Sequence, residues 1–90
     1  MLKDPNAKLP FTMDWSAWLL AENDTALSAA WTVPTGLVRE SSPAESLVDD
    51  KATIWLSGGT AGVIYEVMCR LTTVGGRVDD RTLQIRIQER

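Results

Sequence analysis

The glycine-rich run at residues 56–62, Leu-Ser-Gly-Gly-Thr-Ala-Gly, is the first place where phosphate or nucleophile chemistry could reside. A phosphate loop needs a helix directly behind it and a lysine to hold the nucleotide, whereas this run opens onto the alternating pattern of residues 63–73. A nucleophile elbow needs a glycine two residues before its serine, and Ser57 has Trp55 there. We therefore interpret the run as a turn between strands in which glycine supplies positive φ.

Two pairs of adjacent carboxylates, Asp49-Asp50 and Asp79-Asp80, could suggest acid–base chemistry or calcium binding. Adjacent side chains of an extended chain point to opposite faces, so neither pair converges on one atom. Both pairs lie beside predicted turns, where Asp is favoured for local hydrogen bonds to the backbone. A structural role is the better interpretation of both pairs.

Cys69 lies between Val67 and Leu71 in an alternating pattern, which indicates a small buried side chain rather than a reactive thiolate. The chain has no histidine and one cysteine, so it offers neither the ligands of a zinc site nor an internal disulfide. We expect no metal, no cofactor and no enzymatic activity.

Four tryptophans in 90 residues are the other notable feature. Trp31 is in phase with Leu27 and Val33, so we expect it to fill the core. Trp15 and Trp18 either close one end of the fold or anchor an interface with another subunit.

Trp55 is out of phase with Ile54 and Leu56, so it is predicted to project from the outer face near Ile64 or Met68. An exposed patch of aromatic and aliphatic side chains there would mark a surface for a partner. The alternative is that the N-terminal segment of the protein covers Trp55.

The elements that position these residues are mostly strands. Residues 1–8 are polar and are predicted to be a loose arm ahead of a single domain at residues 9–90. Residues 15–22 fit a short helix capped by Asp14 or Ser16, or else a compact loop. The remaining predicted strands of the first half are an edge strand at residues 9–14, a strand at 25–33, a third from 37 to 40, and either a short edge strand at 46–48 or none.

From Ala52 onward the alternation is strongest and predicts three consecutive antiparallel strands separated by glycine turns. Their predicted inward row is Ile54, Leu56, Val67, Leu71, Leu83, Ile85 and Ile87. Six or seven short antiparallel strands indicate an all-β fold, most simply a β-sandwich of the immunoglobulin type.

Composition sets further limits. The chain is 44% hydrophobic and 23% charged, which is typical of a globular protein, and its net charge of −3 argues against nucleic-acid binding. Residues 1–50 are acidic and residues 70–90 mildly basic, either as scattered surface charge or as complementary faces that help copies or neighbours dock. No segment resembles a membrane span or a secretory signal, so we expect a soluble chain made in the cytoplasm.

Residues 52–67, Ala-Thr-Ile-Trp-Leu-Ser-Gly-Gly-Thr-Ala-Gly-Val-Ile-Tyr-Glu-Val, resemble the corner of fibronectin type III and related immunoglobulin-like domains. In those domains a Gly-Thr turn leads into Tyr-x-Val, and the tyrosine hydroxyl bonds back to the preceding backbone. The resemblance implies that Tyr65 forms such a corner. The chain lacks the cysteine pair of antibody domains, so their disulfide is not implied.

From Phe11 to its end the chain resembles small proteins encoded among the structural genes of tailed bacteriophages and prophages. The motifs are Asp-Trp-Ser at residues 14–16, Trp-Thr-Val-Pro-x-Gly-Leu at 31–37, and Thr-Thr-x-Gly-Gly-Arg at 72–77 followed by alternating Leu and Ile. Such proteins are usually described as fibre-tail adaptors or as head-tail and tail accessory proteins.

This resemblance implies a non-catalytic virion module, made in a bacterial host, that docks onto a tail or neck component and links it to fibres or to another structural protein. A homo-oligomeric ring is compatible with that role. The candidate partner-binding residues are Trp55, Ile64, Met68, Trp15 and Trp18. The alternative function is a carbohydrate- or surface-binding module that uses exposed tryptophans.

Overall fold

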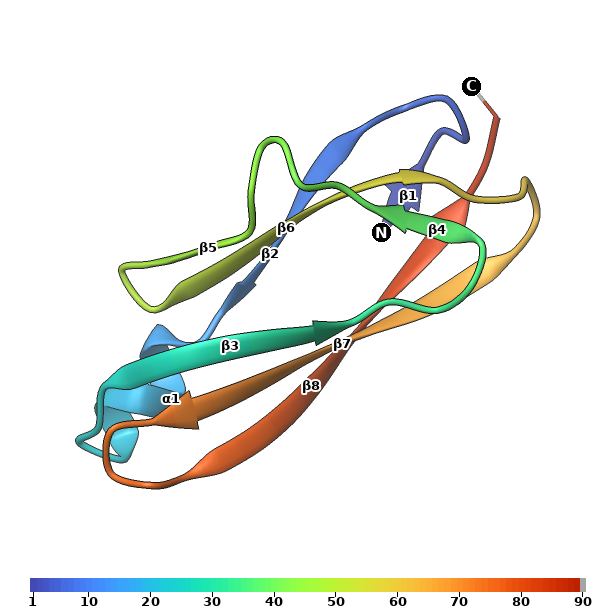
Figure 1. Ribbon diagram of the computed structural model, residues 1–90. Helices are drawn as coiled ribbons and strands as arrows, with labels where there is room; N and C mark the ends of the chain where they lie inside the picture. Colours follow the sequence, from blue (N-terminus) through green and yellow to red (C-terminus); the bar gives the residue numbers. More distant parts are fainter. Residues whose placement is uncertain (90) are drawn as a thin grey trace.

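Two β-sheets packed face to face form the protein, as seen in the computed structural model, which describes residues 1–89 (Figure 1). Sheet A has the strand order β1-β8-β7-β3, and sheet B has the order β2-β6-β4, with β5 also paired to β6. The elements are β1 Leu2–Lys3, β2 Leu9–Asp14, α1 Ser16–Ala21, β3 Ala26–Thr32, β4 Leu37–Arg39, β5 Ser46–Val48, β6 Lys51–Gly58, β7 Ile64–Thr73 and β8 Val78–Ile87. The prediction of an all-β fold with one short helix is confirmed.

Alternating side chains of both sheets meet in one continuous core. Each large aliphatic side chain buried there stabilises the fold by about 1.5–3 kcal/mol. Leu83 is half-buried, and the other predicted inward residues are fully buried: Ile54, Leu56, Val67, Leu71, Ile85 and Ile87. Trp31 is 5% exposed and belongs to the same core, as predicted.

The glycine run after β6 carries the chain from sheet B to sheet A. Gly58, Gly59 and Gly62 all have positive φ. A Cβ atom on Gly59 would lie 2.7 Å from Ile87 Cδ1, so this position also lacks space for a side chain. The prediction of three consecutive antiparallel strands is therefore right only for β7 and β8, because β6 pairs with β2, β4 and β5 in the opposite sheet.

The N-terminal residues do not form the loose arm that their polar composition predicted. In β1, Leu2 and Lys3 pair in parallel with Arg86 and Ile87 of β8. Lys3 is 1% exposed, and its Nζ donates hydrogen bonds to the carbonyl oxygens of Gly58 at 2.7 Å and Asp4 at 2.9 Å. Burial lowers the pKa of the Lys3 ammonium, and the Asp4 carboxylate offsets part of that shift.

One residue of β3 departs from the predicted alternation. The register with β7 shifts between Ala26 and Ser28, which leaves Leu27 unpaired in a bulge and 63% exposed. Leu27 was expected to point inward with Trp31, and this expectation was wrong because the bulge turns its side chain toward solvent.

The predicted helix is present as α1. Trp15 occupies the N-cap position, and Asp14, one residue earlier, accepts hydrogen bonds from the Ser16 N–H at 2.9 Å and the Ser16 hydroxyl at 2.6 Å. Leu19 is the buried residue within the helix. A helix this short depends on packing against the sheets rather than on intrinsic helix propensity.

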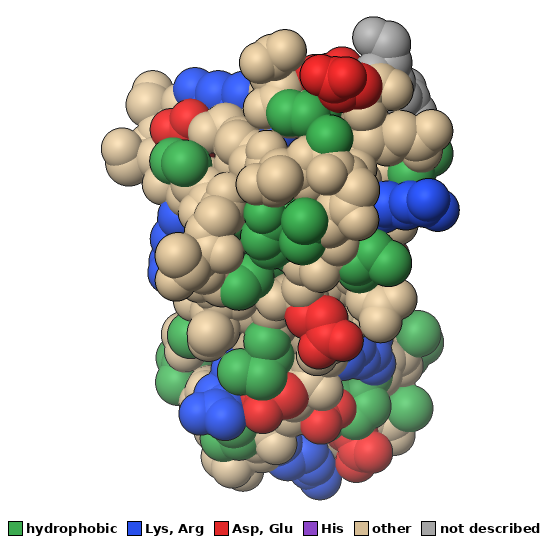
Figure 2. Space-filling model, turned by 90° about the vertical axis from the view of Figure 1, so that its right-hand side faces the viewer, with side chains coloured by type: hydrophobic (Ala, Val, Ile, Leu, Met, Phe, Trp, Pro, Cys, Tyr) green, Lys and Arg blue, Asp and Glu red, His purple; other side chains and the backbone are tan. Residues whose placement is uncertain are grey.

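Asp24 joins the turn after α1 to the turn between β7 and β8. Its carboxylate accepts hydrogen bonds from the Thr25 N–H at 2.8 Å, the Gly75 N–H at 3.0 Å and Arg77 Nη1 at 2.9 Å, and its side chain is only 5% exposed. In Figure 1, α1 and the turn between β7 and β8 lie at the lower end of the molecule. Figure 2 shows basic side chains (blue) and acidic side chains (red) next to one another at the lower end. These contacts, first among them a hydrogen bond with the Thr73 side chain, hold the pKa of Asp24 well below its usual range.

Tyr65 fixes the start of β7 to the crossover that precedes it. Its hydroxyl oxygen accepts a hydrogen bond from the Thr60 N–H at 3.1 Å, and the residue is 9% exposed. A Cβ atom on Gly36 would lie 2.8 Å from this oxygen, so the loop ahead of β4 closes over the ring.

Acid should weaken the Asp24 clamp. Because folding lowers the pKa of Asp24, its contribution is complete above the unfolded-state pKa of about 3.9 and is lost as the pH falls toward the folded-state pKa. We expect Asp24→Asn to lower the melting temperature at neutral pH, and the difference from wild type to shrink as the pH falls from about 5 to about 2. Thermal unfolding followed by circular dichroism measures this. Glu89→Gln, which alters an exposed carboxylate, is the control, and a pH-independent difference for Asp24→Asn would contradict the clamp.

Removing the Tyr65 hydroxyl should destabilise the protein without disturbing its packing. Tyr65→Phe keeps the ring and leaves the Thr60 N–H without its acceptor, so the free energy of unfolding should fall by about 0.5–1.5 kcal/mol. Urea denaturation with tryptophan fluorescence measures the change. An unaltered midpoint at an unaltered slope would show that the bond contributes nothing.

Candidate interaction surfaces

The outer face of sheet A brings together two of the predicted partner-binding residues. Ile64 and Met68 lie on the same face of β7, with Ile64 57% exposed and Met68 half-buried. Arg86 of β8 is the register partner of Ile64, and Thr82 and Thr32 flank Met68 on the neighbouring strands. The face carries aliphatic, small polar and charged side chains, and the exposure of Ile64, Thr82 and Arg86 shows that no other element of residues 1–89 covers them.

An ion pair crosses the same face. Arg70 Nε lies 2.8 Å from Asp80 Oδ1, and Arg70 Nη2 lies 3.0 Å from Asp80 Oδ2. The hydrogen bonds from Arg70 lower the pKa of Asp80. Because both side chains are substantially exposed, the pair adds little to stability, and it neutralises the charge of this part of the face.

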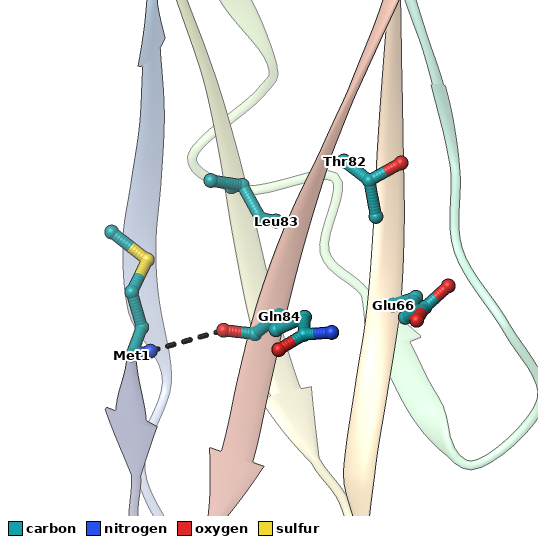
Figure 3. Close-up of a pocket in the computed structure, with 5 residues that line it drawn as sticks. All are labelled: Met1, Glu66, Thr82, Leu83 and Gln84. Carbon is teal, nitrogen blue, oxygen red and sulfur yellow. Dashed lines mark hydrogen bonds between the residues drawn. The ribbon is translucent and has the colours of Figure 1, made fainter.

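A hollow of about 540 Å³ lies where this face meets the β8 edge, lined by Met1, Glu66, Thr82, Leu83 and Gln84. Gln84 stands between Met1 on one side and Glu66 of β7 on the other (Figure 3). The Met1 ammonium donates a hydrogen bond to the Gln84 carbonyl oxygen at 3.0 Å, which closes one end of the hollow.

Trp55 does not lie near Ile64 or Met68. It belongs to β6 in sheet B, where Pro10 of β2 is its register partner and the Glu40 N–H donates to its carbonyl oxygen at 2.9 Å. Its side chain is half-buried on the outer face of sheet B. The predicted patch is therefore two surfaces on opposite sides of the molecule, because β6 and β7 lie in different sheets.

Trp15 and Trp18 lie at the end of the molecule that holds α1. Trp15 is fully buried, so of its two predicted roles it closes the fold and offers no surface to a partner in this conformation. Trp18 is half-buried and meets Trp15 edge to face, with ring centroids 5.6 Å apart. Arg81 stacks over Trp15 at 4.3 Å from the ring centroid, and its Nη1 donates to the Asp14 carbonyl oxygen at 3.2 Å.

A second, smaller hollow of about 240 Å³ opens between β3 and β5, on the side of the sandwich away from β8. Trp31 lines it, and the buried Trp31 indole N–H has no hydrogen-bond partner among residues 1–89. Arg39 extends across this side, where it donates to the Trp31 carbonyl oxygen at 3.0 Å and pairs with Glu45.

The groups first considered for chemistry are dispersed. Asp49 and Asp50 form the positive-φ turn between β5 and β6, while Asp79 accepts a hydrogen bond from the Asp80 N–H. Cys69 is buried, and burial raises the pKa of its thiol. Within residues 1–89, no three His, Cys, Asp or Glu side chains are grouped so as to hold a metal ion.

None of the helices formed by residues 1–89 has both the length and the apolar character needed to span a bilayer.

Two features of β8 were not predicted from the sequence: β1 pairs with only Arg86 and Ile87 of this strand, and a hollow lies beside Thr82, Leu83 and Gln84. Periodicity assigned β8 correctly, but it does not report what lies on the far side of a strand. The available signal was the polar outward series of Thr82, Gln84 and Arg86 beside Glu66, which indicates an uncovered face.

Comparison with known proteins identifies the family. The model of the podophage GP4 fiber-tail adaptor protein gp77 family matches residues 3–86. None of the curated proteins matches the chain. The matched segment runs from β1 almost to the end of β8 and so includes both sheets and the crossover between them. The chain belongs to the podophage GP4 fiber-tail adaptor protein gp77 family.

Proposed function

We propose that this protein is a non-catalytic virion adaptor, made in the host cytoplasm, that docks onto a tail or neck component and links it to fibres or to another structural protein. The match of residues 3–86 to a fibre-tail adaptor family is the observation that carries the proposal. The dispersed carboxylates and the buried Cys69 thiol, whose pKa is raised, support a role in binding rather than in catalysis.

The proposed framework is an immunoglobulin-like sandwich that forms one domain. Two features support it. The chain crosses between sheets from β6 to β7, and Tyr65 at the start of β7 bonds back to the Thr60 N–H, the arrangement of a tyrosine corner. Such a framework holds two flat sheet faces rigidly at a fixed separation, which suits a connector.

The two outer faces suit a protein that bridges partners. Ile64 and Met68 on sheet A form the proposed contact with one virion component, and Trp55 on sheet B is a candidate for a contact with another. Half-buried Trp18 at the α1 end is a third candidate. Contacts between copies in a ring would use the two remaining sides of the sandwich. One side has the hollow at the β8 edge, and the other has the hollow between β3 and β5.

A charge on the outer face of sheet A should prevent incorporation into particles. In Ile64→Lys, docking would have to bury a second cationic group beside Arg86, the register partner of residue 64, at a cost of several kcal/mol. We expect particles assembled with this variant to lack the protein and to lose fibres. Purified particles are analysed by quantitative gel densitometry and electron microscopy.

Val74→Lys is the matched control, since Val74 is a comparably exposed aliphatic residue in the turn between β7 and β8 rather than on a sheet face. Circular dichroism of both purified variants checks that they fold. Normal incorporation of Ile64→Lys would exclude this face as the contact, and loss of both variants would contradict the assignment to sheet A.

A further inference from the structure

The backbone of β8 is paired on both sides only near its end. Toward β1, the Arg86 N–H donates to the Met1 carbonyl oxygen at 2.7 Å, and the Gln88 N–H donates to that of Lys3 at 2.9 Å. The Ile87 N–H instead points toward β7 and donates to Val63 at 3.0 Å. Because backbone groups alternate in direction along a strand, the N–H and C=O of Thr82 point to the same side as those of Arg86.

No strand formed by residues 1–89 covers Thr82 on that side, since β1 reaches only Arg86 and Ile87. The N–H of Asp80 is satisfied by the Asp79 carboxylate at 3.0 Å. The Gln84 carbonyl oxygen already accepts a hydrogen bond from the Met1 ammonium at 3.0 Å. Among residues 1–89, the outward backbone groups left open between Thr82 and Gln84 are therefore the N–H and C=O of Thr82 and the N–H of Gln84.

The edges at β3 and β2 are guarded in ways that hinder strand addition. β3 has its bulge at Leu27, and Arg39 occupies the outward carbonyl of Trp31. β2, at the edge of sheet B, includes Pro10, which lacks an N–H. Bulges, long charged side chains and prolines are the usual protections of an edge strand, and their absence at Thr82 leaves this place open to a further strand.

The hollow lies against the same open stretch. Its volume of about 540 Å³ extends along Thr82, Leu83 and Gln84 and ends at Met1. Glu66 provides its charged group, from β7 opposite Gln84, and the Glu66 carboxylate is exposed and has no ion-pair partner among residues 1–89. A strand placed here would find open backbone groups along one side, with the Glu66 carboxylate one strand further on, across Gln84.

We infer that the stretch from Thr82 to Gln84 takes up an extended segment of a partner protein as a further strand of sheet A, with a long Lys or Arg side chain of that segment reaching across Gln84 toward Glu66. This inference rests on the proposed adaptor function, for which it names the kind of contact. Strand addition derives affinity from the backbone and selectivity from side chains at alternate positions.

Charge complementarity favours a different protein over a second copy. Of the edge strands that another copy could supply, β2, β3 and β5 contain no lysine or arginine, Arg39 of β4 already pairs with Glu45, and Lys3 of β1 is buried. An antiparallel copy of β8 centred on Thr82 would place the acidic Asp80 opposite Gln84. Each would leave Glu66 unpaired.

Nuclear magnetic resonance of the full ¹⁵N-labelled chain can test the inference with two synthetic peptides, Ac-TVKVTVS-NH2 and its glutamate counterpart Ac-TVEVTVS-NH2. We expect the lysine peptide to shift the amide signals of Thr82 and Gln84 and to slow their hydrogen exchange. The glutamate peptide should bind about two- to fivefold more weakly, the difference that one exposed ion pair supplies. Glu66→Lys should reverse this preference.

Thr82→Pro should abolish binding of both peptides, because it removes the outward N–H at an edge position where proline is tolerated. Unchanged β3 signals would show that Thr82→Pro folds. If Thr82→Pro does not fold, Glu66→Lys tests the same site. Absence of shifts at millimolar peptide, shifts at Ala29 and Trp31 instead, or equal affinity for both peptides would each overturn the inference. Loss of Ile64→Lys from particles would leave the adaptor function standing in any of these cases.

Discussion

The passage of the chain from one sheet to the other between Gly58 and Gly62 is the constraint on which the rest of the structure depends. It requires positive φ at glycines and is held at two points, where Lys3 donates to the Gly58 carbonyl and Tyr65 accepts from the Thr60 N–H. Because the chain changes sheets here, β6 and β7 bury their apolar faces against each other. Their polar faces consequently point to solvent on opposite sides of the molecule.

A protein built from two small sheets exposes several strand edges, and this one treats them unequally. A bulge and a long arginine side chain protect the edge at β3, and a proline protects the edge at β2, while the middle of β8 lacks such protection. Unprotected edges carry a risk of aggregation, so a chain is expected to keep one only where pairing is useful. The open part of β8 is also short, which limits unwanted pairing.

Period-two alternation predicted the strands from β2 to β8 well, because each buries one face in the shared core. It failed where side-chain period carries no information. It could not place β6 and β7 in different sheets, so the predicted patch of Trp55 and Ile64 does not exist. It missed β1 because two residues show no period and because burial of Lys3 depends on the Gly58 carbonyl oxygen, an acceptor distant in sequence. The exposure of Leu27 follows from a bulge, which adds one residue without a local signature.

The pairing of β1 with β8 has a mechanical consequence for a protein that connects parts of a virion. The two strands run in parallel, and the hydrogen bonds of Met1 and Lys3 to Gln84, Arg86 and Gln88 lie across the direction of pull between the start of β1 and the end of β8. Tension applied there loads these bonds together in shear rather than one after another, as unzipping would. Rupture then requires them to break at once, and the buried Lys3 ammonium must leave its carbonyl acceptors in the same event. The shortest strand of the fold is in this way the one placed to resist force.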